Sequence, residues 1–273
     1  MAPKPAPLPF RTLDFRAKIL FGVLPGLLVC GVLGFAPGAF AADKAGDTLT
    51  TKEIFQRAAD KYSSLTSYSD EGQTVALVNG TTLTTKFTIK LARPNLYKIE
   101  WARTTDSWVN FLTRHPTQAV WSAGAGDFLD MGTGVQKQAS QEMALGGATG
   151  ISGGAAATIP GTFFKMNWGN ALGTMGTGMK QAPDERAGGV NCYVFGNEMG
   201  GVATTIWIGR DDFLVHQIRH VTGAEAMKVA LDNAAKANPG APRPAIAPSA
   251  ITSTETHTNI ILNAKLDLAG FGR

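Results

Sequence analysis

Residues 68–92 read YSDEGQTVALVNGTTLTTKFTIKLA, and this stretch decides the fold that we expect. The pair Asn79-Gly80 separates two strand-like runs and predicts a tight β-hairpin, because both residues accept a positive φ. The second arm alternates apolar residues with threonine and lysine, and the apolar ones are Leu83, Phe87, Ile89 and Leu91. Such alternation is typical of an antiparallel strand with one buried and one solvated face.

The register of this hairpin has two solutions. A two-residue turn places Leu83 on the same face as Ala76, whereas a three-residue turn with a bulge aligns it with Val75 and Leu77. We expect the bulged register, because it gathers the apolar residues on one face. Residues 79–81 also match a glycosylation sequon, but a turn is the better explanation of this tripeptide.

Further strand-like runs follow along the chain and are separated by turn residues. Most connections are too short for helical crossovers, so we expect an antiparallel meander. The predicted strands are residues 96–102, 107–113, 118–122, 127–131, 192–197, 202–208 and 214–222, with one or two more within 251–268.

Two helices are expected. Residues 50–65 start with a capping box formed by Thr50 and Glu53, and their apolar residues recur at helical spacing. Residues 224–237 are rich in alanine and lead into a proline-rich loop over 238–248. Residues 132–190 are rich in glycine and low in charge, with a short helix expected at 140–145. Long segments of this kind are usually functional or mobile.

The first 41 residues have the order of a secretory signal peptide: basic residues, an apolar run over 19–35, and the small-residue site Ala39-Phe40-Ala41. The apolar run is broken by glycine and proline and is shorter than the roughly 20 residues of a membrane span. An uncleaved N-terminal anchor is the alternative. Cleavage after Ala41 removes four basic residues and one acidic residue, so the net charge falls from +4 to +1. We therefore expect an exported, nearly neutral protein in which Cys192 is the one cysteine.

Motifs of catalysis or cofactor binding are missing from the sequence. It has no P-loop, dinucleotide fingerprint, zinc motif or nucleophile elbow. His216 and His220 share one face of a predicted strand but lie about 13 Å apart, too far for a common metal ion. Asp211 and Asp212 are expected to form a turn. The small net charge argues against nucleic acid. We predict no catalytic site, no metal site and no cofactor.

Tryptophan is abundant for a sheet of this size, at positions 101, 108, 121, 168 and 207. An ordinary core would explain these residues. The alternative is a sheet curved around a cavity, with the helices and the glycine-rich segment as a lid. Such a cavity would hold an apolar ligand through burial, at about 25 cal/mol per Å². It would need no polar residues at a defined spacing.

Three segments, in this order, resemble the periplasmic lipoprotein carrier LolA and its relatives. They are Arg93-Pro94-Asn95-Leu96-Tyr97, residues 187–193 (AGGVNCY) and residues 205–215 (TIWIGRDDFLV). The pattern is most similar to the DUF2092-like family of periplasmic proteins on the LolA/LppX half-barrel. The resemblance implies an open antiparallel β half-barrel with helices on its concave side. It also implies an arginine that bonds to the lid, and Arg93 is the matching position.

Residues and resemblance together predict a signal peptide over 1–41 and a single α+β half-barrel domain over 42–273. This domain would contain a glycine-rich lid over 132–190 and a helix with a proline-rich loop over 224–248. We expect a monomeric periplasmic carrier that binds a lipid or a lipoprotein acyl chain. The alternative is an envelope sensor that binds a protein partner on the same concave sheet. The candidate ligand-binding residues are Phe87, Ile89, Leu91, Arg93, Trp101 and Trp207.

Overall fold

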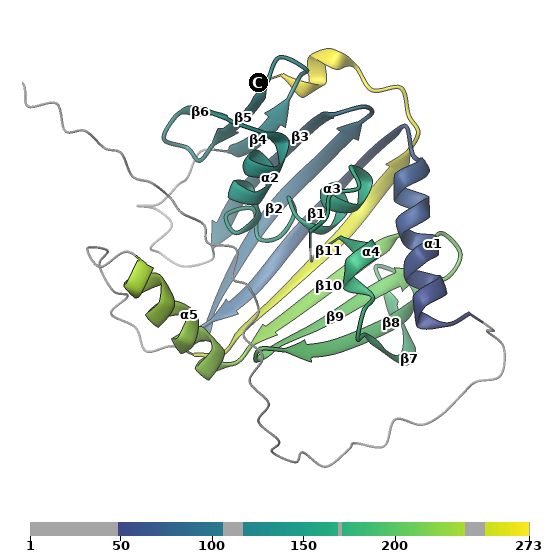
Figure 1. The fold of residues 1–273 in the computed structure, drawn as a ribbon, viewed down its shortest axis with the longest axis vertical. Helices are drawn as coiled ribbons and strands as arrows, with labels where there is room; N and C mark the ends of the chain where they lie inside the picture. Colours follow the sequence, from purple (N-terminus) through teal and green to yellow (C-terminus); the bar gives the residue numbers. More distant parts are fainter. Residues whose placement is uncertain (1–48, 106–116, 169–170, 238–248, 273) are drawn as a thin grey trace, which may run out of the picture. The chain divides into compact units, whose positions relative to one another are not determined.

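A computed structural model of the chain describes residues 49–105, 117–168, 171–237 and 249–272 (Figure 1). These residues all belong to one unit, which spans residues 37–273. Three sequence predictions lie outside the described residues: the signal peptide over 1–41, the strand over 107–113 and the proline-rich loop over 238–248.

Eleven strands of the described residues form one open sheet, in the order β6-β5-β4-β3-β2-β1-β11-β10-β9-β8-β7. Every neighbouring pair is antiparallel. The strands are β1 (Ser67–Val78), β2 (Thr81–Ala92), β3 (Leu96–Thr105), β4 (Gln118–Ser122), β5 (Asp127–Asp130), β6 (Val135–Gln138), β7 (Lys180–Ala187), β8 (Val190–Met199), β9 (Val202–Gly209), β10 (Val215–Thr222) and β11 (Ile251–Leu262).

The path of the chain through the sheet has one long-range step. Strands β1 to β6 follow one another as the predicted meander, and β7 to β10 form a second one. Strand β11 lies between β1 and β10 and joins the two halves. The predicted class, an open antiparallel half-barrel with helices, is therefore confirmed.

The register of the β1–β2 hairpin differs from the predicted one, so the bulged register was wrong. Val78 pairs with Thr81 and Ala76 pairs with Leu83, so the turn has two residues and no bulge. Asn79 (φ 50°) and Gly80 (φ 76°) both adopt positive φ, which suits a type I′ turn. The expected bulge assumed that the hairpin tip must be buried. Leu77 is 48% exposed, so burial gives no reason for a bulge there.

One face of the sheet carries the main apolar core, and the helices cover it (Figure 1). We call this the inner face and the opposite one the outer face. The covering helices are α1 (Thr51–Ser64), α2 (Gln141–Thr149), α3 (Thr158–Phe163) and α4 (Leu172–Met175). Helix α2 packs on β4 and β5, while α3 and α4 pack against α1.

Helix α1 forms as predicted from its capping box. Thr50 N donates to Glu53 Oε2 over 2.7 Å, and Glu53 N donates to Thr50 Oγ1 over 3.3 Å. The predicted apolar stripe is the buried one, and it contains Ile54, Phe55, Ala58 and Tyr62. Tyr62 also accepts a hydrogen bond from Val215 N over 3.0 Å, which ties α1 to the start of β10.

The second predicted helix exists as α5 (Ala224–Ala237), but it does not cover the core. None of its described side chains is fully buried. Besides α1, the cover comes from the glycine-rich segment, which supplies α2, α3 and α4. The same segment also supplies the strands β6 and β7. These two strands were not predicted. Both are edge strands with mostly exposed side chains, so they show no apolar alternation. The last described element is a short 3₁₀ helix over Leu268–Phe271.

Candidate functional site

Four of the six predicted ligand-binding residues lie together on the inner face. Phe87, Ile89 and Leu91 alternate along β2, and Phe87 pairs with Trp101 on β3. All four are at most 3% exposed and belong to the main core cluster. The period of two along β2 predicted this arrangement correctly, because successive inward side chains lie on one face.

Trp207 does not join them. Its neighbours Ile206 and Ile208 belong to the main core, so Trp207 points to the outer face. There it packs with the strand β8 residue Cys192, and its Nε1 donates to Glu185 Oε2 over 2.9 Å. The sequence motif placed Trp207 on a strand but could not say which face of the sheet it would take.

Arg93 connects α1 to the glycine-rich segment. Its Nη2 donates to Ser63 O over 3.1 Å and also to Phe163 O, while its Nε donates to Leu65 O over 3.3 Å. The guanidinium carbon lies 4.3 Å from the centroid of the Phe163 ring and 6.0 Å from that of Phe164. Arg93 thus bonds to the ends of α1 and α3 together.

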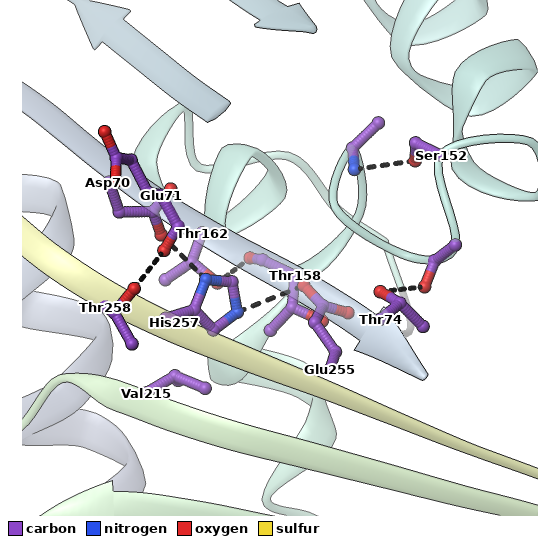
Figure 2. A network of polar contacts seen from close by, with 12 residues as sticks. Asp70, Glu71, Thr74, Ser152, Thr158, Thr162, Val215, Glu255, His257 and Thr258 are labelled. Atoms are coloured by element: carbon purple, nitrogen blue, oxygen red, sulfur yellow. Dashed lines mark hydrogen bonds and ion pairs between the residues drawn. The ribbon is translucent and has the colours of Figure 1, made fainter. Parts of the chain in front are cut away.

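A buried charged cluster lies at the centre of the inner face, where β1 meets β11 (Figure 2). His257 Nδ1 is 2.7 Å from Asp70 Oδ2, and His257 Nε2 is 3.0 Å from Glu255 Oε1. The hydroxyl of Tyr68 donates to the same Asp70 Oδ2 over 2.7 Å. Asp70 Oδ1 and His257 Nε2 are buried and have no hydrogen-bond partner among the described residues, so His257 and Glu255 form an ion pair whose geometry is poor for a hydrogen bond. We call Asp70, His257 and Glu255 the ion triad.

The electrostatics of the triad favour a charged histidine. Burial by itself disfavours the imidazolium, but the charge and hydrogen bond of Asp70, together with the charge of Glu255, outweigh it and raise the pKa of His257 to about 10. Burial and the negative charge of Asp70 both raise the pKa of Tyr68, so this hydroxyl stays a donor. The triad therefore carries one positive and two negative charges within the apolar core.

The glycine-rich segment rests directly on this cluster. Thr74 of β1 pairs with Glu255 of β11, and its Oγ1 donates to Gly153 O over 3.0 Å. Gly154 has φ +112°, and a Cβ at that position would lie 2.5 Å from Glu255 Oε2. A side chain at residue 154 would thus be strained and would strike the carboxylate. Glycine at this position allows the backbone to cover the triad.

Sequence reasoning missed the triad, although one signal was present. Glu255 and His257 are two residues apart on a predicted strand, so period two places both on one face. Their partner Asp70 lies 187 positions from His257, and only the β1–β11 register brings it there. His216 and His220, the two histidines that the sequence suggested as possible metal ligands, contact nearby residues instead. His216 pairs with Asp212 over 3.0 Å, and His220 contacts Thr204 over 3.0 Å.

The part of the chain that the structure describes contains no group of three or more His, Cys, Asp or Glu side chains that could hold a metal ion. None of its helices is long and apolar enough to span a membrane. Cys192 is buried, and burial raises the pKa of its thiol to about 11.

No protein-family model and no curated protein matches the chain. Among solved structures, a chain of the Pseudomonas aeruginosa MucA/MucB complex is similar at 10% identity and a TM-score of 0.40, with 82% of this chain covering 60% of that one. LprF from Mycobacterium bovis matches at 8% identity and a TM-score of 0.40, and the match covers 80% of this chain and 95% of LprF. An "outer membrane lipoprotein-sorting protein domain" from Vibrio parahaemolyticus matches at 9% identity and a TM-score of 0.32. The match covers 81% of this chain and 95% of that one.

At 8–10% identity and TM-scores of 0.32–0.40, these similarities carry no assignment to a superfamily, and the LolA/LppX resemblance stays the expectation that the sequence motifs raised. The DUF2092-like subfamily stays a prediction. This chain spans 60% of the matched MucA/MucB chain. No function is transferred from proteins of such low identity.

Proposed function

We propose that this is an exported envelope protein that binds an apolar ligand, a lipid or a lipoprotein acyl chain, between the inner face of the sheet and the glycine-rich segment. The segment over residues 132–190 acts as the lid, and Arg93 holds the lid to α1. The ligand would contact Phe87, Ile89, Leu91 and Trp101 once the lid has moved. Trp207 is left out of the proposed lining because it lies on the outer face.

The observation that carries the proposal is the mismatch between the two sides of the core. The floor presents large side chains, among them Phe87, Ile99 and Trp101. The lid above buries six alanines, at positions 144, 148, 155, 156, 157 and 171, beside a few larger side chains such as Leu145, Ile159 and Phe163. An alanine buries far less apolar area than a leucine or an aromatic residue, so the alanine-rich part of the lid, residues 144–157, loses less burial on moving off the floor than the larger side chains of α3 and α4. An acyl chain could replace the burial that the lid gives up.

The lid is also built from weak elements. Helix α3 has six residues and α4 has four, and neither has a side-chain N-cap. Isolated helices of this length are unstable in water, so their order depends on the contacts beneath them. Helix α1, by contrast, has a full capping box and a stripe of large buried residues. This contrast favours opening of the lid while the rest of the fold stays intact.

Fluorescence quenching by 9,10-dibromostearate tests the proposal, because bromine quenches tryptophan only at short range. Trp101 and Trp121 form a matched pair: both are buried, on neighbouring strands, but they lie on opposite faces of the sheet. We expect saturable quenching that falls in Trp101→Phe and persists in Trp121→Phe. Equal quenching in both variants, or none in the unmodified protein, would contradict the proposed site.

Native mass spectrometry of protein purified from its own envelope identifies the ligand class. A co-purifying lipid mass supports the carrier. A co-purifying protein without lipid would favour the alternative, an envelope sensor with a protein partner on the inner face.

A further inference from the structure

The ion triad is the feature of the inner face that an acyl chain alone does not explain. Such a chain needs no buried charges, and buried polar groups are costly unless they are bonded. The triad nevertheless adjoins the proposed floor of the ligand site, because the ring centroids of Phe87 and His257 are 5.4 Å apart. The glycine-rich segment lies over it, since a Cβ at Gly154 would touch Glu255. A ligand held between floor and lid therefore lies beside the triad.

We propose that the ion triad is the polar end of the ligand site, where Asp70 Oδ1 accepts a hydrogen bond from the first polar group of the ligand. The ligand class is then an acyl chain next to an uncharged donor, either a hydroxyl or an amide N–H. A free fatty acid is an anion, and a simple ester donates no hydrogen bond, so both fit less well. This inference rests on the proposed function, because it names the polar group of the ligand proposed there.

Asp70 has one carboxylate oxygen in use and one without a partner. Its Oδ2 lies 2.7 Å from His257 Nδ1 and accepts from the Tyr68 hydroxyl, also over 2.7 Å. Its Oδ1 is buried without a hydrogen-bond partner among the described residues, in a side chain that is 0% exposed. A carboxylate can only accept hydrogen bonds, and an unsatisfied buried acceptor is unfavourable. A ligand donor that reaches Oδ1 is therefore stabilised there.

The hydroxyl groups around the triad are bonded to other atoms. Asp70 and Tyr68 are both buried on the inner side of β1, but the Tyr68 hydroxyl donates to Oδ2. Thr74, Ser152 and Thr162 each donate their hydroxyl to a backbone carbonyl oxygen of the glycine-rich segment. A donor on the ligand would thus complete the bonding of Asp70 without displacing any of these hydroxyls.

The charge of the triad disfavours an anionic ligand. Asp70 and Glu255 flank His257 (Figure 2), so two carboxylates face one imidazole and the net charge is negative whether the ring is charged or neutral. Residues 150–158 of the lid contain no ionisable side chain. On β10, burial lowers the pKa of His220, which keeps that ring neutral. A ligand carboxylate at this point would meet like charge in an apolar core, where repulsion is strong.

The register of the sheet connects the triad to the tryptophan that reports binding. His257, Gly72, Phe87 and Trp101 lie opposite one another across β11, β1, β2 and β3. Gly72 leaves its place to the Phe87 ring, because a Cβ there would lie 2.3 Å from that ring. Three strand spacings separate the ends of this row, about 14 Å. A ligand with its polar group at the triad would extend its chain over Phe87 toward Trp101.

Four ligands with the same brominated chain test the inference on the unmodified protein. They are 9,10-dibromostearate, its methyl ester, its primary amide and the corresponding alcohol, and quenching of tryptophan fluorescence gives the Kd of each. We expect the amide and the alcohol to bind about tenfold to a hundredfold more tightly than the ester, the contribution of one hydrogen bond to a charged group. The free acid at neutral pH should bind no more tightly than the ester. A preference for the amide would indicate an N-acylated protein end, and a preference for the alcohol a lipid with a free hydroxyl.

Two variants separate Asp70 from other carboxylates of the protein. In Asp70→Asn the acceptor is a neutral amide oxygen, so the preference for the alcohol over the ester should fall severalfold and the free acid should bind more tightly. Asp127→Asn is the matched control, because Asp127 already accepts from the Tyr97 hydroxyl over 2.7 Å. This variant should keep the ligand order of the unmodified protein. If Asp70→Asn does not fold, the four ligands on the unmodified protein still decide.

Equal affinities for the alcohol, the amide and the ester would overturn the inference and leave the proposed function standing, since water would then satisfy Asp70 Oδ1 equally well. Tightest binding by the free acid would also overturn it. Quenching by none of the four ligands would refute the proposed function and, with it, the inference.

Discussion

His257 Nδ1 lies 2.7 Å from Asp70 Oδ2, although 187 positions separate the two residues. The contact exists because β11 pairs with β1 and places His257 opposite Gly72. Gly72 leaves space there: a Cβ at that position would lie 2.3 Å from the Phe87 ring. The pair is therefore a product of the step that joins the two halves of the sheet, and its charges contribute to stability only after that step.

Replacing His257 by leucine should destabilise the protein strongly. The change leaves Asp70 and Glu255 buried without a cation, and breaking a buried ion pair on one side costs about 3–5 kcal/mol. Urea unfolding at pH 7 would show this as a lower midpoint. The matched control is His216→Leu, whose partner Asp212 is partly exposed and can be solvated. Equal losses in the two variants would mean that the triad is no more than an ordinary surface pair.

Thermal stability should decline on the alkaline side. The folded-state pKa of His257 is raised to about 10 by Asp70 and Glu255, so the stabilisation is complete below the unfolded pKa of about 6.5. It is lost as the pH rises from there through 10. Calorimetry from pH 6 to 10 should show a falling Tm, with a shallower fall in His257→Gln. A Tm that rises over this range would contradict the assignment of charge.

Gly154→Ala should destabilise the closed lid by about 1–3 kcal/mol, the usual range for strained backbone. The residue has φ +112°, and its new Cβ would strike Glu255. Gly146→Ala is the matched control, because Gly146 lies inside α2 and a Cβ there meets nothing within 4 Å. That variant should gain about 0.5–1 kcal/mol from helix propensity. Chemical denaturation of both proteins, with lid hydrogen exchange, measures the difference. The same effect in both would show that residue 154 makes no special contact.

Arg93→Lys should loosen the lid while keeping the charge. A lysine ammonium cannot reproduce the planar fork that bonds Ser63 O, Leu65 O and Phe163 O together. We expect faster proteolytic cleavage within residues 141–179 and an unchanged far-UV spectrum. Arg219→Lys is the control, since Arg219 lies over Trp207 on the outer face. Equal cleavage rates for the two variants would refute a lid-holding role for Arg93.

Local signals in the sequence predicted much of the fold. The capping box at Thr50 and Glu53 placed the start of α1, and the alternation after Asn79-Gly80 placed β2 and its buried face. Strands β6 and β7 were not predicted, and the reason is physical. An edge strand with exposed side chains needs no apolar period, and β7 also contains Pro183, which is typical of edge strands.

The sequence by itself determined the elements that depend on neighbouring residues: the hairpin at residues 79–80, helix α1, and the inward side chains of β2. Their φ preferences and spacings are encoded within a few positions. Only the tertiary structure decided three further features. These are the two-residue register of the first hairpin, the outer-face position of Trp207, and the meeting of Asp70 with His257 and Glu255. The first follows from the positive φ of Asn79 and Gly80, which suits a two-residue turn. The other two depend on which strands pair and in what register, and that choice is made by packing between segments far apart in the chain.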